Sequence, residues 1–173
     1  MSQRYFGRAG ACLLLAPWLA AAPSLAHALG QVDAGVLVND YDSAVDSTTG
    51  WRVSGGYLIH DFVALELAYV ALGQGDLRGK QTRYRVDGIA FGVRGYLPLT
   101  PDIFAVGHLG SFHYESRMHL LGQSHYSDGN GLYFGVGAEW SPAGPWYVGG
   151  DWRRYQVHGT HPQSFTLYVG ARF

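Results

Sequence analysis

Apolar and polar residues alternate with a period of two along much of this chain, most regularly over its last ten residues. From Ser164 to Phe173 every second residue is apolar, and the residues between them are Ser, Thr, Tyr, Gly and Arg. Successive side chains of a β-strand point to opposite faces, so this pattern predicts a strand with one apolar and one polar face. A strand that ends on an apolar aromatic residue is an aggregation hazard unless it closes a barrel.

Similar segments recur upstream, separated by turn residues. They predict further strands over about residues 30–39, 51–59, 63–69, 83–97, 103–115, 132–140 and 146–153. Polar loops are predicted at residues 40–50, 72–82, 116–130 and 156–163, with short turns at 60–61, 98–101 and 141–145. Arg85 and Asp87 interrupt the apolar face of the fourth strand, either because a bulge shifts the phase or because they lie beyond a bilayer. The fifth strand alternates too weakly for its inward face to be assigned.

The resulting fold class is all-β, an eight-stranded antiparallel up-and-down transmembrane β-barrel. Segments of about 9 to 11 residues suit a tilted strand that crosses the hydrocarbon layer. Short turns that alternate with longer loops are typical of outer-membrane barrels. A soluble barrel of the lipocalin kind has the same strand order, but its apolar faces would point inward. Aromatic residues near the strand ends favour the membrane barrel: Trp51, Tyr69, Trp140, Trp146 and Phe173.

A barrel with apolar faces toward lipid encloses the charged residues of the opposite faces. The predicted interior ion-pair network consists of Arg52, Glu66, Arg94, Glu139, Asp151, Arg153 and Arg172. An unpaired ion in a narrow interior is costly, and the mixture of signs allows near-complete pairing. Eight strands leave an interior only wide enough for side chains, so the network is expected to fill the barrel. It either stabilises the barrel or acts as a gate that admits water or small ions.

The first 28 residues have the order of a secretory signal peptide. Arg4 and Arg8 precede an apolar run, and Ala26-His27-Ala28 follows as a cleavage site. We therefore expect a signal peptide over residues 1–28 and one outer-membrane barrel domain over residues 29–173. Removing the two arginines changes the formal net charge from −1 to −3. With no basic face along the strands, nucleic acid is not an expected partner.

Two segments and the terminal residue resemble a known family. Residues 56–69 combine a tyrosine, a tight turn and an apolar strand that carries Glu66, and residues 131–140 form a glycine-spaced strand that carries Glu139. With the terminal Phe173, these motifs resemble the small outer-membrane β-barrel family that includes the OmpA transmembrane domain and OmpX. The resemblance implies a bacterial outer-membrane location, contact with outer-membrane lipid and lipopolysaccharide, and insertion by the barrel-assembly machinery, with Phe173 as the insertion signal. It also implies a non-enzymatic role in envelope integrity or in contact with a surface or host ligand.

One segment offers an alternative, enzymatic function. His125-Tyr126-Ser127 resembles a segment of the lipid A deacylase PagL family, and a His and a Ser two apart on a strand could act as base and nucleophile. In that family the segment lies on the penultimate strand, whereas here it is predicted in a loop with three strands to follow. The catalytic alternative therefore rests on His125 and Ser127, with Glu115 or Asp128 to orient the histidine. A lipid A-modifying hydrolase is the second function considered.

Imidazole side chains recur at the end of the fifth predicted strand and in the predicted loops that follow. They belong to His113, His119, His125, His158 and His161. Imidazole suits Zn, Cu or Ni, but close-set ligands on one element are missing. We expect neither a metal nor a cofactor.

Overall fold

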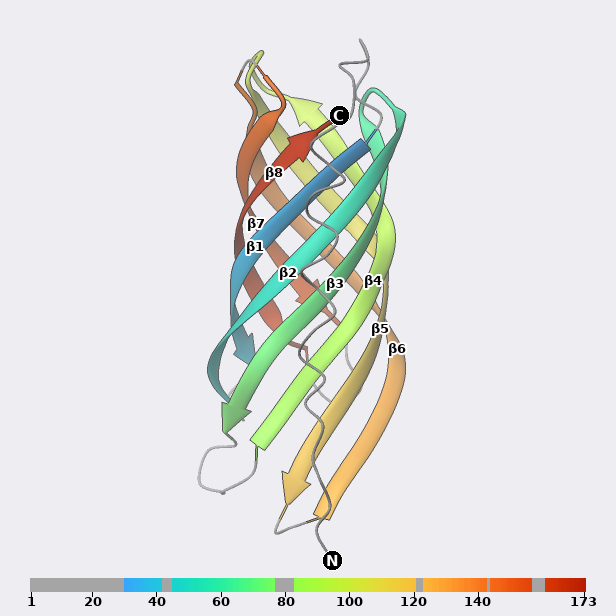
Figure 1. Ribbon diagram of the computed structural model, residues 1–173, viewed down its shortest axis with the longest axis vertical. Coiled ribbons are helices and arrows are strands. Elements are labelled where there is room, and N and C mark those ends of the chain that lie inside the picture. Colours follow the sequence, from blue (N-terminus) through green and yellow to red (C-terminus); the bar gives the residue numbers. More distant parts are fainter. Residues whose placement is uncertain (1–29, 42–44, 77–82, 121–122, 143, 157–160) are drawn as a thin grey trace, which may run out of the picture.

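Eight antiparallel strands form one closed barrel in the order of the sequence (Figure 1). The structure, a computed structural model, describes residues 30–41, 45–76, 83–120, 123–142, 144–156 and 161–173. The strands are β1 (Gly30–Tyr41), β2 (Val45–His60), β3 (Val63–Asp76), β4 (Arg83–Pro98), β5 (Ile103–Leu120), β6 (Gln123–Trp140), β7 (Trp146–Tyr155) and β8 (Gln163–Arg172). The predicted eight-stranded, up-and-down barrel is confirmed. None of the described residues forms a helix long and apolar enough to cross a membrane.

The last strand closes the barrel. β8 pairs with β7 on one side and with β1 on the other, from Gln31–Arg172 to Asp40–Gln163. Main-chain hydrogen bonds between Gly30 and Phe173, at 2.8 and 2.9 Å, extend this ladder to the terminal residue. The sheet edge that the sequence pattern left open is thus removed. The predicted signal peptide lies outside the described residues.

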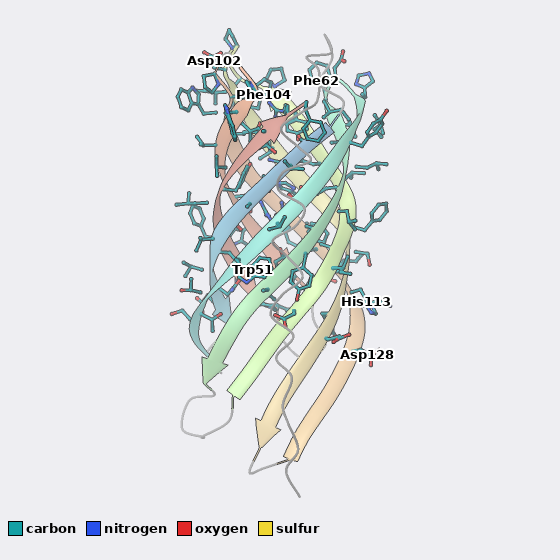
Figure 2. The ribbon with its side chains drawn as sticks, viewed as in Figure 1. Trp51, Phe62, Asp102, Phe104, His113 and Asp128 are labelled. Atoms are coloured by element: carbon teal, nitrogen blue, oxygen red, sulfur yellow. The ribbon has the colours of Figure 1, made fainter. Side chains whose placement is uncertain are left out.

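The two ends of the barrel differ. The turns at Phe62 and Asp102 lie at the end where β1 begins and β8 finishes (Figure 2). At the other end β5 and β6 extend beyond the remaining strands (Figure 1). Short turns face the periplasm in outer-membrane barrels, so the projecting β5–β6 hairpin is at the extracellular end.

Several strands are longer than the sequence pattern predicts. The predicted loops at 40–50, 72–82 and 116–130 are wrong in part, because β2 begins at Val45, β3 continues to Asp76, and β5 and β6 pair from Ile103–Trp140 to Leu120–Gln123. In the extension of β2 the residues still alternate between exposed and buried, but the exposed ones are Ser47 and Thr49 and the buried ones Thr48 and Gly50. The alternation of apolar and polar residues is therefore lost while the main-chain ladder continues. The irregularity opposite Arg85 and Asp87 is a register shift in β3, between Ala71 and Gln74.

The outer surface is apolar across the middle of every strand. Side chains that are about half exposed or more on this surface include Val36, Val53, Leu67, Phe91, Leu109, Val136 and Leu167. The soluble-barrel alternative is wrong, because it would place these residues in the core. The inward face of β5, which the sequence left open, carries Val106, His108, Phe112 and Tyr114. Its polar and apolar members explain the weak alternation.

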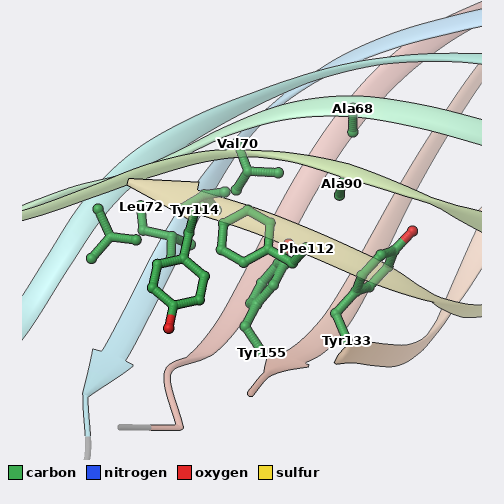
Figure 3. Packing of buried hydrophobic residues seen from close by; sticks show 10 residues of the cluster. Ala68, Val70, Leu72, Ala90, Phe112, Tyr114, Tyr133 and Tyr155 are labelled. Carbon is green, nitrogen blue, oxygen red and sulfur yellow. The ribbon is translucent and has the colours of Figure 1, made fainter. Parts of the chain in front are cut away.

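Side chains fill the extracellular half of the interior with an apolar cluster, which Figure 3 shows. Its members are Leu37, Ala68, Val70, Leu72, Val86, Ala90, Phe112, Tyr114, Tyr133 and Tyr155. The ring centroids of Phe112 and Tyr155 are 4.8 Å apart, and those of Tyr133 and Tyr155 are 5.7 Å apart. A smaller cluster of Ala64, Tyr96 and Val106 lies toward the periplasmic end. The charged residues lie between the two clusters.

Candidate functional site in the barrel interior

Every strand contributes at least one charged or imidazole side chain to the interior. In strand order they are Asp33, Arg52, Glu66, Arg94, His108, Glu139, Asp151 with Arg153, and Arg172. Eight of the nine are buried, and the side chain of Arg172 is 19 % exposed. Period-two alternation places them there, because each lies between outward-facing neighbours that are apolar or small, except that Arg154 follows Arg153.

Arg94 is the centre of the periplasmic part of the network. Its Nη1 lies 2.8 Å from Asp33 Oδ2, and its Nη2 lies 2.7 Å from Glu139 Oε2. Nη2 also donates to the Tyr168 hydroxyl at 2.8 Å. Glu139 is shared, since Arg172 pairs with its other carboxylate oxygen. One guanidinium thus ties β1, β6 and β8 to β4 across the barrel.

Arg153 is the centre of the second part. Its Nη1 lies 2.8 Å from Glu66 Oε1, and its Nη2 lies 3.1 Å from Asp151 Oδ2. Asp151 also accepts from Arg52 Nη1 at 3.0 Å. His108 Nδ1 lies 3.0 Å from Arg153 Nη2, and because arginine can only donate, this imidazole nitrogen is the acceptor.

The two parts are joined into one network. Glu66 Oε2 lies 3.7 Å from Arg94 Nη1, and Asp33 Oδ1 lies 3.6 Å from Arg52 Nη2. Asp33 also accepts hydrogen bonds from the Ser54 hydroxyl at 2.6 Å and the Tyr147 hydroxyl at 3.2 Å. Among the described interior residues, four arginines face four carboxylates. The enclosed formal charge is therefore balanced when His108 is neutral.

Aromatic rings complete the surroundings of the arginines. The guanidinium carbon of Arg94 is 5.1 Å from the Tyr168 ring centroid, and that of Arg172 is 4.7 Å from the Tyr147 centroid. A cation over the face of a desolvated ring gains further electrostatic stabilisation. Charged, hydroxyl and aromatic groups from all eight strands therefore form a cross-braced filling.

All seven residues of the predicted network lie in this interior and form ion pairs there. The sequence reasoning missed Asp33 and His108. Asp33 stands on the polar side of a clean alternation, together with Gln31 and Asn39, so the same rule that found the others was sufficient to find it. His108 lies on β5, where weak alternation hid the inward face.

His125 and Ser127 of the enzymatic alternative lie on β6, so their predicted placement in a loop is wrong. The main chains of His125 and Ser127 pair with Met118 and Ser116 of β5, and two strands follow instead of three. The side chains of His125 and Ser127 lie outside the described residues. Glu115 and Asp128 pair in register, and both are exposed.

The histidines considered as metal ligands are distributed along β5, β6 and the segments beyond them. His113 Nδ1 lies 2.7 Å from Asn130 Oδ1 on the outer face of the hairpin (Figure 2). His119 lies on β5, His161 precedes β8, and His158 lies outside the described residues. Within the described ranges no three His, Cys, Asp or Glu side chains are grouped closely enough to hold a metal ion.

Most of the sequence matches a known family of membrane barrels. Residues 11–173 match the family described as outer membrane protein beta-barrel domain. The chain belongs to this family. It is a bacterial outer-membrane protein whose strands cross the membrane. No curated protein sequence matches it.

Solved structures of similar fold come from several bacteria. The outer membrane protein OprG from Pseudomonas aeruginosa matches with a TM-score of 0.64 and 14 % identity, over 84 % of this chain and 96 % of that one. Neisserial surface protein A matches with a TM-score of 0.63 and 14 % identity, over 83 % and 96 %. Ail, the attachment invasion locus protein of Yersinia pestis, matches with a TM-score of 0.62 and 13 % identity, over 83 % and 97 %. At such low identity these similarities establish the fold alone.

Proposed function

We propose that this protein is a non-enzymatic barrel of the outer-membrane surface, in which the charged interior stabilises the barrel and the β5–β6 hairpin makes contacts outside the cell. The observation that carries the proposal is the shape of the extracellular end. β5 and β6 each have 18 residues, whereas β7 and β8 each have 10. The hairpin therefore projects on one side of the barrel (Figure 1).

The outer part of the hairpin has the polarity of a water-exposed surface. His113, Glu115 and Asp128 are exposed on it, and the His113–Asn130 contact bridges its two strands. An apolar wall below and a polar surface above fit a strand pair that leaves the membrane. A rigid, paired extension also presents its side chains with less loss of conformational entropy than a loop would.

The interior supports a structural role for the ion pairs. The arginines at positions 52, 94 and 153 have no exposed area, and the apolar cluster covers them toward the extracellular end. Each contacts carboxylates from other strands, so the pairs hold the wall together across the barrel. The gate considered from the sequence would require several of these contacts to break together.

The names of two proteins of similar fold support a surface role for this one. One is a neisserial surface protein, and another is an attachment invasion locus protein whose complex with the heparin analogue sucrose octasulfate has been solved. We propose the same general class of role here, with contact made by the hairpin. Insertion by the barrel-assembly machinery and contact with lipopolysaccharide form part of the proposal.

Expression in a bacterium that lacks the protein tests this function. Cells that carry the chain should attach to a heparin-coated surface better than cells with an empty vector, and their lipid A mass spectrum should be unchanged. A variant in which residues 116–127 are replaced by an Asn-Gly turn should keep the barrel and lose the attachment. Equal attachment by the shortened variant would contradict the role of the hairpin.

The same cells test the enzymatic alternative. Loss of an acyl chain from lipid A that disappears in His125→Ala would overturn the non-enzymatic proposal. The Ser127→Ala variant checks whether the second residue of that segment takes part.

A further inference from the structure

The outer face of the short side of the barrel carries a groove at its extracellular end. It has a volume of about 480 Å³ and lies across β7, β8, β1 and β2. Its apolar lower part consists of Trp152, Phe165 and Val38, which pair in register across three strands. Its polar upper part consists of Gln163, Asp40 and Ser47. The groove therefore begins where the lipid-facing surface gives way to polar residues.

Arg154 lies beside this polar row. Its main chain pairs with Gln163 of β8 and with Phe134 of β6, so the register places it on the outer surface, two residues beyond Trp152. It is half-buried, and within the part of the chain that the structure describes it forms no ion pair. A partly desolvated guanidinium without a counter-ion is costly, so this position favours an anionic ligand. Arginine binds phosphate with two parallel hydrogen bonds.

The height of the site identifies the source of the anion. Because β7 and β8 have only 10 residues each, their outer ends lie at the membrane surface and do not rise above it. An occupant must therefore be carried by a lipid whose acyl chains lie against the apolar wall below. Phe165 and Leu167, which are 53 % and 63 % exposed, continue this wall along β8.

The remaining groups favour a sugar. Trp152 Nε1 donates to Gln163 Oε1 at 3.3 Å, which orients the glutamine and leaves its amide hydrogens free to donate. Trp152 is also held by an edge contact with Phe134, at 5.8 Å between centroids. An oriented indole beside an amide, a carboxylate and a hydroxyl offers both a ring face and several hydrogen-bonding groups. A hydroxyl-rich ring uses both, whereas a glycerol headgroup has few hydroxyls.

We propose that this groove, together with Arg154, binds the phosphorylated sugar headgroup of lipopolysaccharide. Arg154 contacts the phosphate, Trp152 lies against the sugar ring, and Gln163 and Asp40 bind its hydroxyls. The inference specifies the contact with lipopolysaccharide that the proposed function includes, and it rests on the membrane placement of the barrel. It does not depend on attachment by the hairpin. Failure of the surface role in cells would leave it unaffected.

Native mass spectrometry of the purified, folded full-length barrel in detergent tests the site. The probes are diphosphorylated lipid A, the same lipid without its phosphates, and phosphatidylglycerol. We expect the wild type to bind diphosphorylated lipid A about tenfold more tightly than the lipid without its phosphates, since one charge-assisted contact is worth about that factor. It should also bind diphosphorylated lipid A more tightly than phosphatidylglycerol, which has a phosphate but no sugar ring. Arg154→Gln should lose the advantage of diphosphorylated over dephosphorylated lipid A, and Arg154→Lys should keep most of it. His113→Gln, on the far side of the rim, is the matched control and should bind as the wild type does.

Each other outcome contradicts part of the proposal. Unchanged binding by Arg154→Gln would overturn the phosphate contact. Equal binding of phosphatidylglycerol would overturn the selection of a sugar headgroup. Trp152→Leu separates the ring contact from the charge, because it should weaken the binding of lipid A and leave the binding of phosphatidylglycerol unchanged. The heat-dependent gel mobility of each variant verifies that the barrel is folded.

Discussion

Replacing Arg94 by methionine tests the cross-bracing of the barrel. The side chain removed has no exposed area and donates to Asp33 at 2.8 Å, to Glu139 at 2.7 Å and to Tyr168 at 2.8 Å. Methionine keeps much of the volume but none of the donors. Three arginines would then face four carboxylates, which leaves one buried negative charge uncompensated. Breaking a buried pair in this way costs about 3–5 kcal/mol, and we expect a loss of that size.

A second substitution separates charge balance from packing. Glu139→Gln removes the negative charge closest to Arg94, so Arg94→Met with Glu139→Gln again encloses equal numbers of positive and negative charges. The loss in free energy of unfolding of the double variant should be smaller than the sum of the two single losses by at least about 1 kcal/mol, as expected for residues in direct contact. Arg172→Met is the control, because it also leaves three arginines facing four carboxylates but removes a side chain that is 19 % exposed and leaves Glu139 paired with Arg94. It should lower the free energy of unfolding by only about 1 kcal/mol.

Urea unfolding in phospholipid vesicles, followed by tryptophan fluorescence, measures these free energies. Gel mobility with and without heating gives the folded fraction independently. If Arg94→Met lost less than about 1 kcal/mol, or if the two substitutions were additive, the ion pairs would not hold the wall together.

Three further predictions concern the wall and its closure. Val136→Arg should lower the free energy of unfolding in vesicles by about 2–4 kcal/mol because this position faces lipid. Asp128→Arg, on the same strand but beyond the membrane, should change that free energy by less than about 0.5 kcal/mol. Equal losses in the two variants would contradict the assigned membrane level. Gly92→Ala should destabilise the barrel by about 1–3 kcal/mol in the same assay, because the added methyl group would lie 2.3 Å from the Leu109 carbonyl oxygen. Gly107→Ala should be neutral, because no heavy atom lies within 4 Å of the methyl group added there. Deleting Phe173, which is 44 % exposed, should reduce outer-membrane assembly in cells. The shortened chain should still refold in detergent. Normal assembly in cells would disprove the role of Phe173 as an insertion signal.

The strands within the membrane could be predicted from the sequence because one rule applies to all of them. Lipid on one side and a polar interior on the other force strict alternation, as in β8, and the charged residues fall on the inner side by the same rule. Arg52, Arg94 and Glu139 were therefore found without a structure. Their partners were not, because pairing depends on the shear of the barrel and on which strands face each other across it.

The extracellular half was predicted less well, for physical reasons. The sequence at 116–130 is rich in polar residues and resembles a loop, although the main chain is paired from Ser116–Ser127 to Leu120–Gln123. The inner surface at this level is apolar, with Phe112 and Tyr114 facing inward while His113 faces outward, which reverses the pattern seen on β8. The groove beside Arg154 joins residues of four strands, and no local pattern contains it.

All the other inferences depend on the apolar outer surface of the barrel facing lipid. This orientation can be measured with single spin labels, because the only cysteine, Cys12, lies in the predicted signal peptide and residues 29–173 contain none. Labels at Leu167→Cys and Asp128→Cys, in the purified barrel in vesicles, would report collisions with oxygen, which dissolves in lipid, and with a water-soluble nickel chelate. The structure predicts that the label at position 167 collides mainly with oxygen and the label at position 128 mainly with nickel. A label at position 167 that collides mainly with nickel would contradict a lipid-facing apolar wall and, with it, the enclosed charged interior.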